Sequence, residues 1–213
     1  MISYYIDSIM LFKKIPNEIV DEKVLEKLKK KVKLVDAIGK GHRGVVFKGI
    51  YNNKTVAVKI PRTDGKNTIL NEVNILKLLE PYNISPKVYD YSKDYLIMEY
   101  IEGEELKSVV EKLDKKNLIE VIEEVLKIAL RLDSLNIEHK EIKGGRHFLV
   151  GEKVYIIDFD KAKKKKTTKN FTSAIALLFG ENKVGKVVRN KLNLNEDDIK
   201  FIKRLAKIYK GSV

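Results

Sequence analysis

The chain has 213 residues, of which 43 are Lys or Arg and 30 are Asp or Glu, so its formal net charge is +13. Hydrophobic residues make up 44% of the sequence, which is enough for a buried core, and no compositional bias indicates disorder or a fibrous protein. The sequence contains no cysteine. This excludes a disulfide framework, a cysteine zinc site and a thiol nucleophile.

No segment has the features of a membrane span or a signal peptide. The longest apolar runs cover residues 95–98 and 174–179, far short of the ~18 residues that cross a bilayer. Residues 1–12 include Asp7 and lack both a basic leader and a small-residue cleavage site. We therefore expect a cytoplasmic protein with no membrane partner. Its positive charge favours an anionic partner such as a nucleotide, a nucleic acid or an acidic protein.

The first half of the chain alternates between β-branched runs and helical patterns. Residues 18–31 place apolar residues at helical spacing, with acidic residues early and lysines late, and predict a helix. The following elements are predicted as strands over 32–38, 45–51 and 55–60, a helix over 68–79, and strands over 87–91 and 95–100.

The second half is mainly helical, and the boundary is expected near Gly103. A β-hairpin is predicted over residues 148–150 and 154–158. The predicted helices cover 104–113, 117–135, 172–179 and 196–210, the last capped by Asn195 and Gly211.

A glycine-rich turn lies between the first two predicted strands. Residues 38–46 fit the pattern G-x-G-x-x-G-x-V, in which glycines let backbone N–H groups approach phosphates. A strand, and not a helix, follows Gly44, which argues against a dinucleotide-binding site. A glycine cluster in a hairpin is also found in ordinary turns. Other parts of the sequence must therefore show whether this turn binds phosphate.

One such signal is Lys59, which lies among apolar neighbours in the third predicted strand, with Glu72 on the following helix. A buried ammonium needs an anionic partner, so we expect a Lys59–Glu72 ion pair that directs the lysine to the phosphates of a nucleotide. The alternative is an exposed strand lysine and a solvated glutamate. Residues 95–103 give an apolar strand followed by a polar connector suited to adenine.

Two later segments complete an order of signals that resembles the protein kinase superfamily. Residues 132–143 read L-D-S-L-N-I-E-H-K-E-I-K and resemble the helix end and catalytic loop L-H-S-L-G-I-x-H-R-D-L-K. Residues 154–160 read V-Y-I-I-D-F-D and resemble the strand that enters the D-F-G magnesium motif.

This resemblance implies an α+β, bilobal protein-kinase-like fold, with an antiparallel β N-lobe containing one helix and a minimal helical C-lobe. The implied domains are an N-terminal extension with a helix over residues 1–31, an ATP-binding N-lobe over 32–102 and a truncated C-lobe over 103–213.

The resemblance also implies a site for ATP with Mg²⁺ or Mn²⁺. Its catalytic residues would be Lys59, Glu141 and Asp158, and its metal ligands would be His147, Asp158 and Asp160. Met98 would precede the hinge. The residues implied in nucleotide binding are Ile38, Gly39, Lys40, Gly41, His42, Arg43, Gly44, Val45, Val46, Lys59, Glu72, Glu99 and Ile101.

Three residues depart from the family pattern. Glu141 replaces the aspartate that receives the substrate proton, and its extra methylene shifts the carboxylate in a site that is sensitive to small errors. His147 aligns with the metal-binding asparagine only if one residue is inserted, and imidazole suits softer metals than Mg²⁺. It would bind Mn²⁺ or phosphate, or support the loop. Asp160 replaces the glycine of D-F-G, and in an extended segment it would face the same metal as Asp158.

The other two histidines have simpler interpretations. We expect His139 to brace the catalytic loop without contacting substrate, because supporting histidines outnumber reacting ones at such sites. We expect His42 at the loop tip to be exposed.

Only 213 − 160 = 53 residues follow Asp160, and they contain neither an A-P-E motif nor an evident activation loop. The chain thus resembles compact archaeal Ser/Thr kinase-like proteins and, more distantly, RIO and Bud-type atypical kinases. Residues 161–169 contain six lysines, beginning at Lys161 and ending at Lys169. This tract is interpreted as a solvated linker or as a site for an acidic protein or RNA.

The sequence is therefore interpreted as an ATP-dependent phosphotransferase, an atypical protein kinase that transfers the γ-phosphate of ATP to a Ser or Thr hydroxyl of a protein substrate or of its own chain. Two alternatives remain open. One is a pseudokinase or ATPase-type nucleotide-binding module in an RNA- or ribosome-linked assembly. The other is a small-molecule kinase.

Overall fold

The computed structural model describes residues 19–41 and 43–212. The predictions made for residues 1–12 and for His42 lie outside the described residues. The chain divides into two compact units, the first ending at Tyr100 and the second beginning at Ile101.

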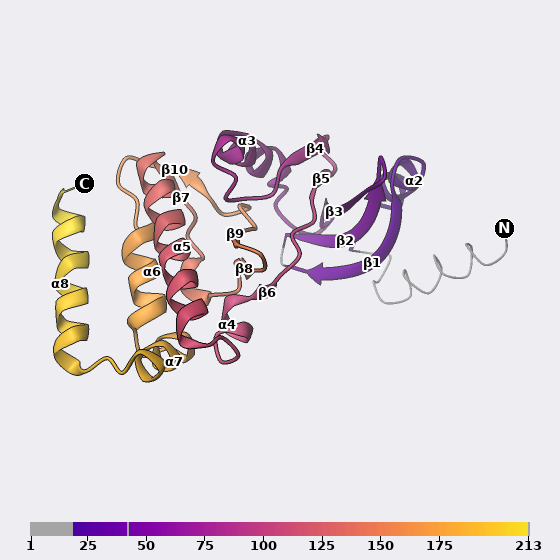
Figure 1. Ribbon diagram of the computed structural model, residues 1–213. Coiled ribbons are helices and arrows are strands. Elements are labelled where there is room, and N and C mark those ends of the chain that lie inside the picture. Colours follow the sequence, from indigo (N-terminus) through magenta and orange to yellow (C-terminus); the bar gives the residue numbers. More distant parts are fainter. Residues whose placement is uncertain (1–18, 42, 213) are drawn as a thin grey trace. The chain divides into compact units, whose positions relative to one another are not determined.

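An antiparallel five-stranded sheet forms the first unit (Figure 1). Val45 and Phe47 of one strand and Val56 and Val58 of the next are fully buried, because β-branched and aromatic side chains fit a pleated, covered surface. In spatial order the strands are β1 (Lys33–Lys40), β2 (Gly44–Tyr51), β3 (Lys54–Pro61), β5 (Leu96–Glu99) and β4 (Val88–Tyr91).

In the described part of this unit, two α-helices accompany the sheet. The helix α2 (Glu22–Lys29) is capped by Asp21, whose carboxylate accepts a hydrogen bond from the N–H of Lys23. Leu25 and Leu28 of α2 belong to the same hydrophobic cluster as Phe47 and Val58 of the sheet. The helix α3 (Ile69–Leu79) is followed by the short 3₁₀ turn η1 (Glu80–Tyr82), and α3 contacts β4.

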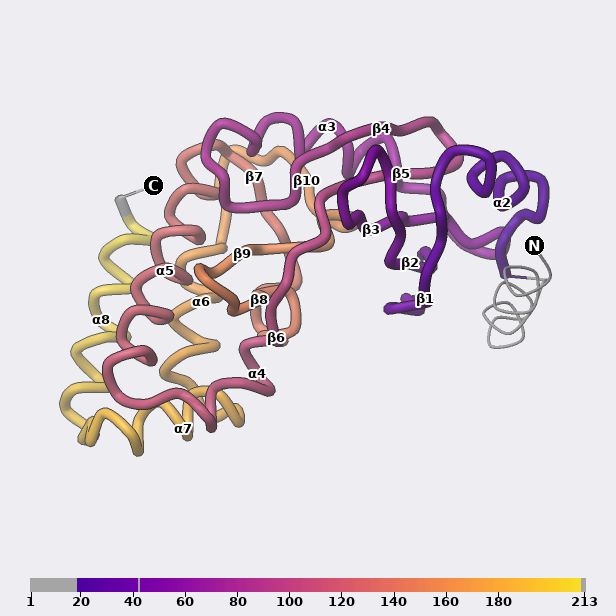
Figure 2. The backbone as a smooth tube through the Cα atoms, turned by 45° about the vertical axis from the view of Figure 1, so that its right-hand side comes forward, coloured from indigo at the N-terminus to yellow at the C-terminus, as the bar shows by residue number. Residues whose placement is uncertain are grey.

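The second unit is mainly helical. Its elements in chain order are β6 (Glu104–Glu105), α4 (Leu106–Val109), α5 (Lys115–Ser134), β7 (Ile137–Glu138), η2 (Ile142–Gly144), β8 (Phe148–Val150), β9 (Val154–Ile156), β10 (Lys163–Lys164), α6 (Asn170–Phe179), α7 (Lys183–Leu192) and α8 (Glu196–Ser212). The helix α6 packs between α5 and α8, which Figures 1 and 2 show side by side. The short strands form two small antiparallel sheets, β6-β8-β9 and β10-β7.

Two predictions in this unit are wrong, and one helix was not predicted. The expected helix over 104–113 is reduced to α4, because β6 pairs with β8 first. The helix α7 was not predicted, since it contains Gly185 and many polar residues, yet Asn182 caps it by accepting from the N–H of Gly185. Gly211 is not a cap, because α8 continues through it. Asn195 does cap α8, accepting from the N–H groups of Asp197 and Asp198.

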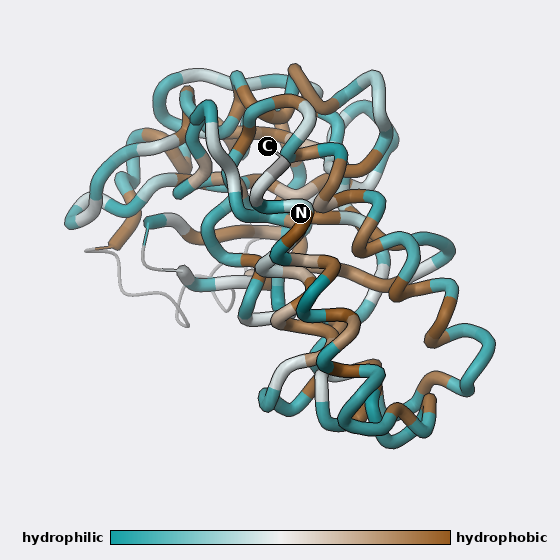
Figure 3. Tube along the Cα trace, turned by 90° about the vertical axis from the view of Figure 1, so that its left-hand side faces the viewer, coloured by the Kyte–Doolittle hydropathy of each residue, from teal (hydrophilic) through white to brown (hydrophobic). Residues whose placement is uncertain are grey.

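Hydrophobic and hydrophilic residues alternate along the chain (Figure 3). The helix predicted over residues 117–135 forms as α5, and its Leu118, Val125, Ala129 and Leu132 are fully buried. Among the described residues, no helix combines the length and the apolar character needed to cross a membrane.

Candidate active site

The glycine-rich turn forms a tight hairpin between β1 and β2. The N–H of Gly41 donates to the carbonyl oxygen of Gly44 at 2.9 Å. A Cβ atom on Gly44 would lie 2.9 Å from the carbonyl oxygen of Ile60, so glycine is required by the close approach of β3. Of the residues predicted to bind nucleotide here, Ile38, Gly39 and Lys40 end β1, Gly44, Val45 and Val46 begin β2, and Gly41 and Arg43 lie between the strands.

The expected pair between Lys59 and Glu72 forms. Lys59 Nζ lies 2.7 Å from Glu72 Oε2, and the two side chains are 7% and 1% exposed. Lys59 is on β3 and Glu72 is in the first turn of α3, so strand and helix together position one buried ammonium. Burial of this charge is tolerated because a carboxylate faces it.

The residues predicted at the hinge lie at the end of β5. Met98 is buried and pairs with Ala57 of β3. Glu99 is tied to Lys87 twice, through a backbone hydrogen bond of 2.8 Å and through Oε2, which accepts from the Lys87 N–H at 3.2 Å. Ile101, which begins the second unit, is 8% exposed.

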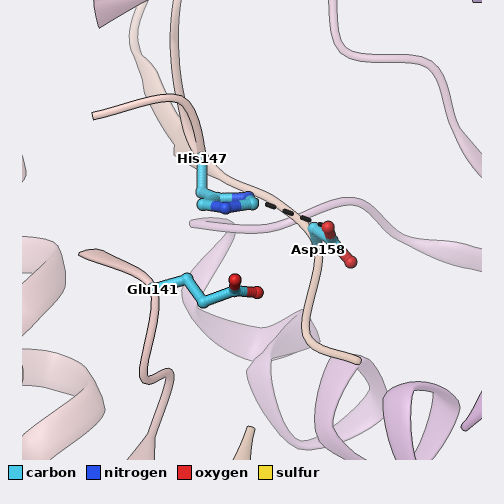
Figure 4. A group of neighbouring side chains, drawn as sticks. All are labelled: Glu141, His147 and Asp158. Carbon is cyan, nitrogen blue, oxygen red and sulfur yellow. Dashed lines mark ion pairs between the residues drawn. The ribbon is translucent and has the colours of Figure 1, made fainter. Parts of the chain in front are cut away.

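Three predicted residues converge within the second unit. Ligand atoms of Glu141, His147 and Asp158 all lie within 4.8 Å of one another. Figure 4 shows that the three side chains come from separate segments, the loop after β7, the turn before β8 and the chain after β9. His147 Nδ1 lies 3.8 Å from Asp158 Oδ2. One imidazole and two carboxylates are thus brought to a common point.

This donor set fits a divalent cation. The carboxylates of Glu141 and Asp158 offer the oxygen ligands that hard cations prefer, and the ring of His147 offers a nitrogen. All three side chains are half-buried. The residues present are therefore compatible with the divalent metal ion that phosphoryl transfer requires.

The backbone is strained at this point. Lys140, next to Glu141, has φ +75°, and Asp158 has φ +66°. Side chains larger than glycine rarely adopt this left-handed region, and such strain is concentrated at functional sites. The expectation of an extended segment from Asp158 to Asp160 is wrong, because Asp158 is left-handed and Asp160 begins a turn. Asp160 is buried outside the three-residue group, and its metal role stays a prediction.

His139 is buried and braces the loop, as expected. Its Nε2 lies 3.0 Å from the carbonyl oxygen of Ile157, and its Nδ1 accepts from the N–H of Glu141 at 3.3 Å. The second contact requires an unprotonated Nδ1, so Nε2 carries the proton. Burial lowers the pKa of His139 to about 4, even though the hydrogen bond to Ile157 opposes this shift. A neutral imidazole thus joins Glu141 to the residue that precedes Asp158.

A second buried network was missed by sequence analysis. Asn170, the first residue of α6, donates its side-chain amide to Asp133 Oδ1 at 2.7 Å and to the carbonyl oxygen of Ile137 at 2.7 Å. Its own Oδ1 accepts from the N–H of His139 at 3.0 Å. The only sequence signal was an aspartate beside the buried stripe of α5. The network fixes the catalytic loop to two helices.

The lysine tract is not a simple linker. Lys163 and Lys164 form β10, which pairs with β7. Lys161 Nζ lies 2.7 Å from Glu141 Oε1, and Lys165 Nζ lies 3.5 Å from Glu138 Oε2. Part of the tract is thus folded against the catalytic loop.

The contact with Lys161 changes the proton affinity of Glu141. Burial by itself raises the pKa of this carboxyl, but the hydrogen bond from Lys161 and the charge of its ammonium act against burial, and the pKa lies below its ordinary value. Glu141 is therefore ionised near neutral pH, the state in which a carboxylate can accept a proton.

Comparison with known proteins identifies the fold. Residues 32–178 match the protein kinase domain family. The chain belongs to the protein kinase family. The five-stranded sheet with its buried lysine, and the helical unit with its loop carboxylates, agree with the kinase architecture.

Three relatives show how far the similarity extends. An uncharacterised protein of Methanocaldococcus jannaschii is 66% identical over 114 residues, which cover 53% of this kinase and 98% of the relative. The KEOPS complex subunit Bud32 of Pyrococcus abyssi is 33% identical over 110 residues, which cover 49% of this kinase and 50% of Bud32. A protein of Encephalitozoon cuniculi named "Probable casein kinase II subunit alpha homolog" is 31% identical over 121 residues, which cover 53% of this kinase and 37% of that protein.

This kinase thus spans half or less of the two relatives whose names state a role. Family and relatives together support a kinase-type phosphotransferase, and kinase domains in general use ATP and a divalent metal ion.

Proposed function

We propose that this kinase transfers the γ-phosphate of ATP to a Ser or Thr hydroxyl of a protein, including hydroxyls of its own chain. The observation that carries the proposal is the convergence of Glu141, His147 and Asp158 within 4.8 Å on a strained, braced loop. The buried Lys59–Glu72 pair supports it, because a fixed ammonium is the group that kinases place at the nucleotide phosphates.

Each side chain has one role in the proposed reaction. Lys59, held by Glu72, neutralises charge on the phosphates. Asp158 and His147 would hold the divalent metal ion, whose charge offsets that of the phosphates when it is bound. Glu141 orients the acceptor hydroxyl and takes its proton as the new oxygen–phosphorus bond forms and the bond to ADP breaks. His139 holds the Glu141 backbone in place.

Two observations favour a second candidate, a nucleotide-binding module that serves an assembly. One of the relatives is named as a subunit of a complex, and the Glu141 carboxylate is already paired with Lys161. In that case this kinase would bind ATP without transferring phosphate to protein. For either candidate, an acidic protein or RNA at the lysine tract stays a prediction, and Lys163, Lys164, Lys166 and Lys169 of the tract are exposed.

The two candidates are separated by the fate of the γ-phosphate. The chain is incubated with γ-labelled ATP and Mg²⁺ or Mn²⁺, alone and with a generic basic protein, and labelled residues are identified by phosphoamino acid analysis. The proposal expects label on Ser or Thr that is absent with Lys59→Ala. Label on Tyr alone, or release of inorganic phosphate without labelled protein, contradicts it.

A further inference from the structure

Glu141 contacts Lys161 and also belongs to the candidate cation site. Its carboxylate is one of three groups that offer ligand atoms within 4.8 Å to a cation, together with those of His147 and Asp158. Its Oε1 also accepts a hydrogen bond from Lys161 Nζ at 2.7 Å. A residue that acts as the proton acceptor must not be consumed as a metal ligand, so the outcome of this competition decides what Glu141 does.

The pairing of β10 with β7 brings Lys161 close to the loop that carries Glu141. β10 and β7 are antiparallel, and Lys163 pairs with Glu138. Two residues before Lys163 this register places Lys161 beside Lys140, and the side chain of Lys161 reaches Glu141, the next residue along the loop. The ladder continues on the other side, where the N–H of Lys165 donates to the carbonyl oxygen of Asn136 at 2.8 Å.

The segment that joins Asp158 to Lys161 is also held in place. The N–H of Ala162 donates to the carbonyl oxygen of Phe159 at 3.0 Å, closing a turn directly after Asp158. Phe159 and Ala162 are fully buried. Lys161 therefore projects from a segment held at both ends, with 40% of its side chain exposed and 24% of that of Glu141.

An ammonium in contact with a carboxylate opposes the binding of a second cation to it, because it neutralises the negative charge and repels the metal. The pair also restricts the extra torsion that Glu has over Asp. We propose that Lys161 is a positioning residue that keeps Glu141 out of the metal coordination sphere and ready to take the substrate proton. The part of this inference that concerns proton transfer to Glu141, its proton step, rests on the proposed function. The part that concerns metal binding, its metal step, does not.

The test is a titration of MnCl₂ into the full chain, followed by the EPR signal of free Mn²⁺. Lys161→Met should bind Mn²⁺ about three- to tenfold more tightly than the wild type, because Glu141 becomes a ligand. Lys161→Arg should behave like the wild type. Lys127→Met is the matched control, since it removes a lysine from an exposed carboxylate pair on α5, where Lys127 and Glu123 are 3.2 Å apart, and should change nothing.

Repeating the titration in a Glu141→Gln background shows whether tighter Mn²⁺ binding comes from ligation by Glu141 or only from loss of the positive charge of Lys161. The gain caused by Lys161→Met should disappear in this background, because a neutral amide then replaces the carboxylate at this position. An equal gain in both backgrounds would show a through-space charge effect and overturn the proposal. No gain in Lys161→Met, or no Mn²⁺ binding in any variant, would overturn it as well.

The rate of phosphoryl transfer should change in the opposite direction to the affinity for Mn²⁺. Lys161→Met should lower kcat about tenfold with little change in KM for ATP, and Lys161→Arg should restore most of it. An unchanged kcat in Lys161→Met contradicts the proton step. If no variant transfers phosphate while the Mn²⁺ cycle behaves as expected, the proposed function fails and the metal step of this inference stands.

Discussion

The side-chain amide of Asn170 lies 2.7 Å from Asp133 Oδ1, and this contact joins the start of α6 to the end of α5. Asp133 also accepts from the backbone N–H of Asn170 at 3.1 Å and from that of Phe171 at 3.0 Å, so it caps α6. Because Asn170 in turn accepts from the N–H of His139, the catalytic loop is positioned by helices and does not depend on its own sequence alone.

Replacing Asn170 with Asp should therefore destabilise the second unit. The new carboxylate would face that of Asp133 in a buried site, and the donor to Ile137 would be lost. We expect a decrease of about 2–4 kcal/mol in the free energy of unfolding, measured by urea denaturation. Asn74→Asp, on the exposed side of α3, is the control. A loss of the same size in both variants would contradict this account.

The buried pair of Lys59 and Glu72 gives a prediction for the first unit. Glu72→Leu leaves a buried ammonium without its carboxylate and should cost about 3–5 kcal/mol of stability. The double variant Lys59→Met/Glu72→Leu should recover most of that loss, because neither charge remains, yet it should not bind ATP. Urea denaturation and ATP titration measure the two effects. Recovery of ATP binding in the double variant would remove Lys59 from the nucleotide site.

The sequence predicts those parts of the site that follow from local patterns of residues. It does not predict contacts that depend on how distant segments pair. Lys59 and Glu72 were identified because the strand pattern and helix pattern around each are local, and their pair then follows from the cost of burying a lone charge. The contact of Lys161 with Glu141 was not predicted. It depends on the register of β10 against β7, two strands of two residues each that no periodicity indicates.

The same distinction between local patterns and tertiary contacts applies to the fold. β2 and β3 were predicted within one residue because their β-branched runs are bounded by turn residues. The helix α7 was missed because its burial is confined to Val184, Gly185 and Val188, which is a weak helical stripe. The left-handed backbone at Asp158 also has no sequence signal, since tertiary contacts impose it.

The burial of His139 should make the stability of the second unit sensitive to acid. Its pKa falls from an ordinary value near 6.5 to about 4 on folding, so below pH 6.5 the unfolded chain binds a proton that the folded chain does not. The stability it contributes is complete above pH 6.5 and is lost as the pH falls through 4. In EDTA, wild type should lose roughly 2–4 kcal/mol more than His139→Asn between pH 7 and pH 4. Equal losses would show that His139 titrates normally.

His147 predicts a metal preference. An imidazole ligand favours Mn²⁺ and softer cations, whereas an amide oxygen favours Mg²⁺. His147→Asn should weaken Mn²⁺ binding, measured by calorimetry, and raise the ratio of Mg²⁺-supported to Mn²⁺-supported transfer several-fold. Unchanged metal binding would show that His147 supports the loop and does not coordinate the ion.

The central claim is that Asp158 and its neighbours perform phosphoryl transfer. The most direct measurement is single-turnover transfer of γ-label from ATP to protein by wild type, Asp158→Asn and Asp197→Asn, together with thermal unfolding of each. Asp197 is the control, because its side chain is 89% exposed on α8. We predict that Asp158→Asn loses transfer by more than about a hundredfold while unfolding as cooperatively as wild type, and that Asp197→Asn retains it. Transfer by folded Asp158→Asn at the wild-type rate would contradict the account.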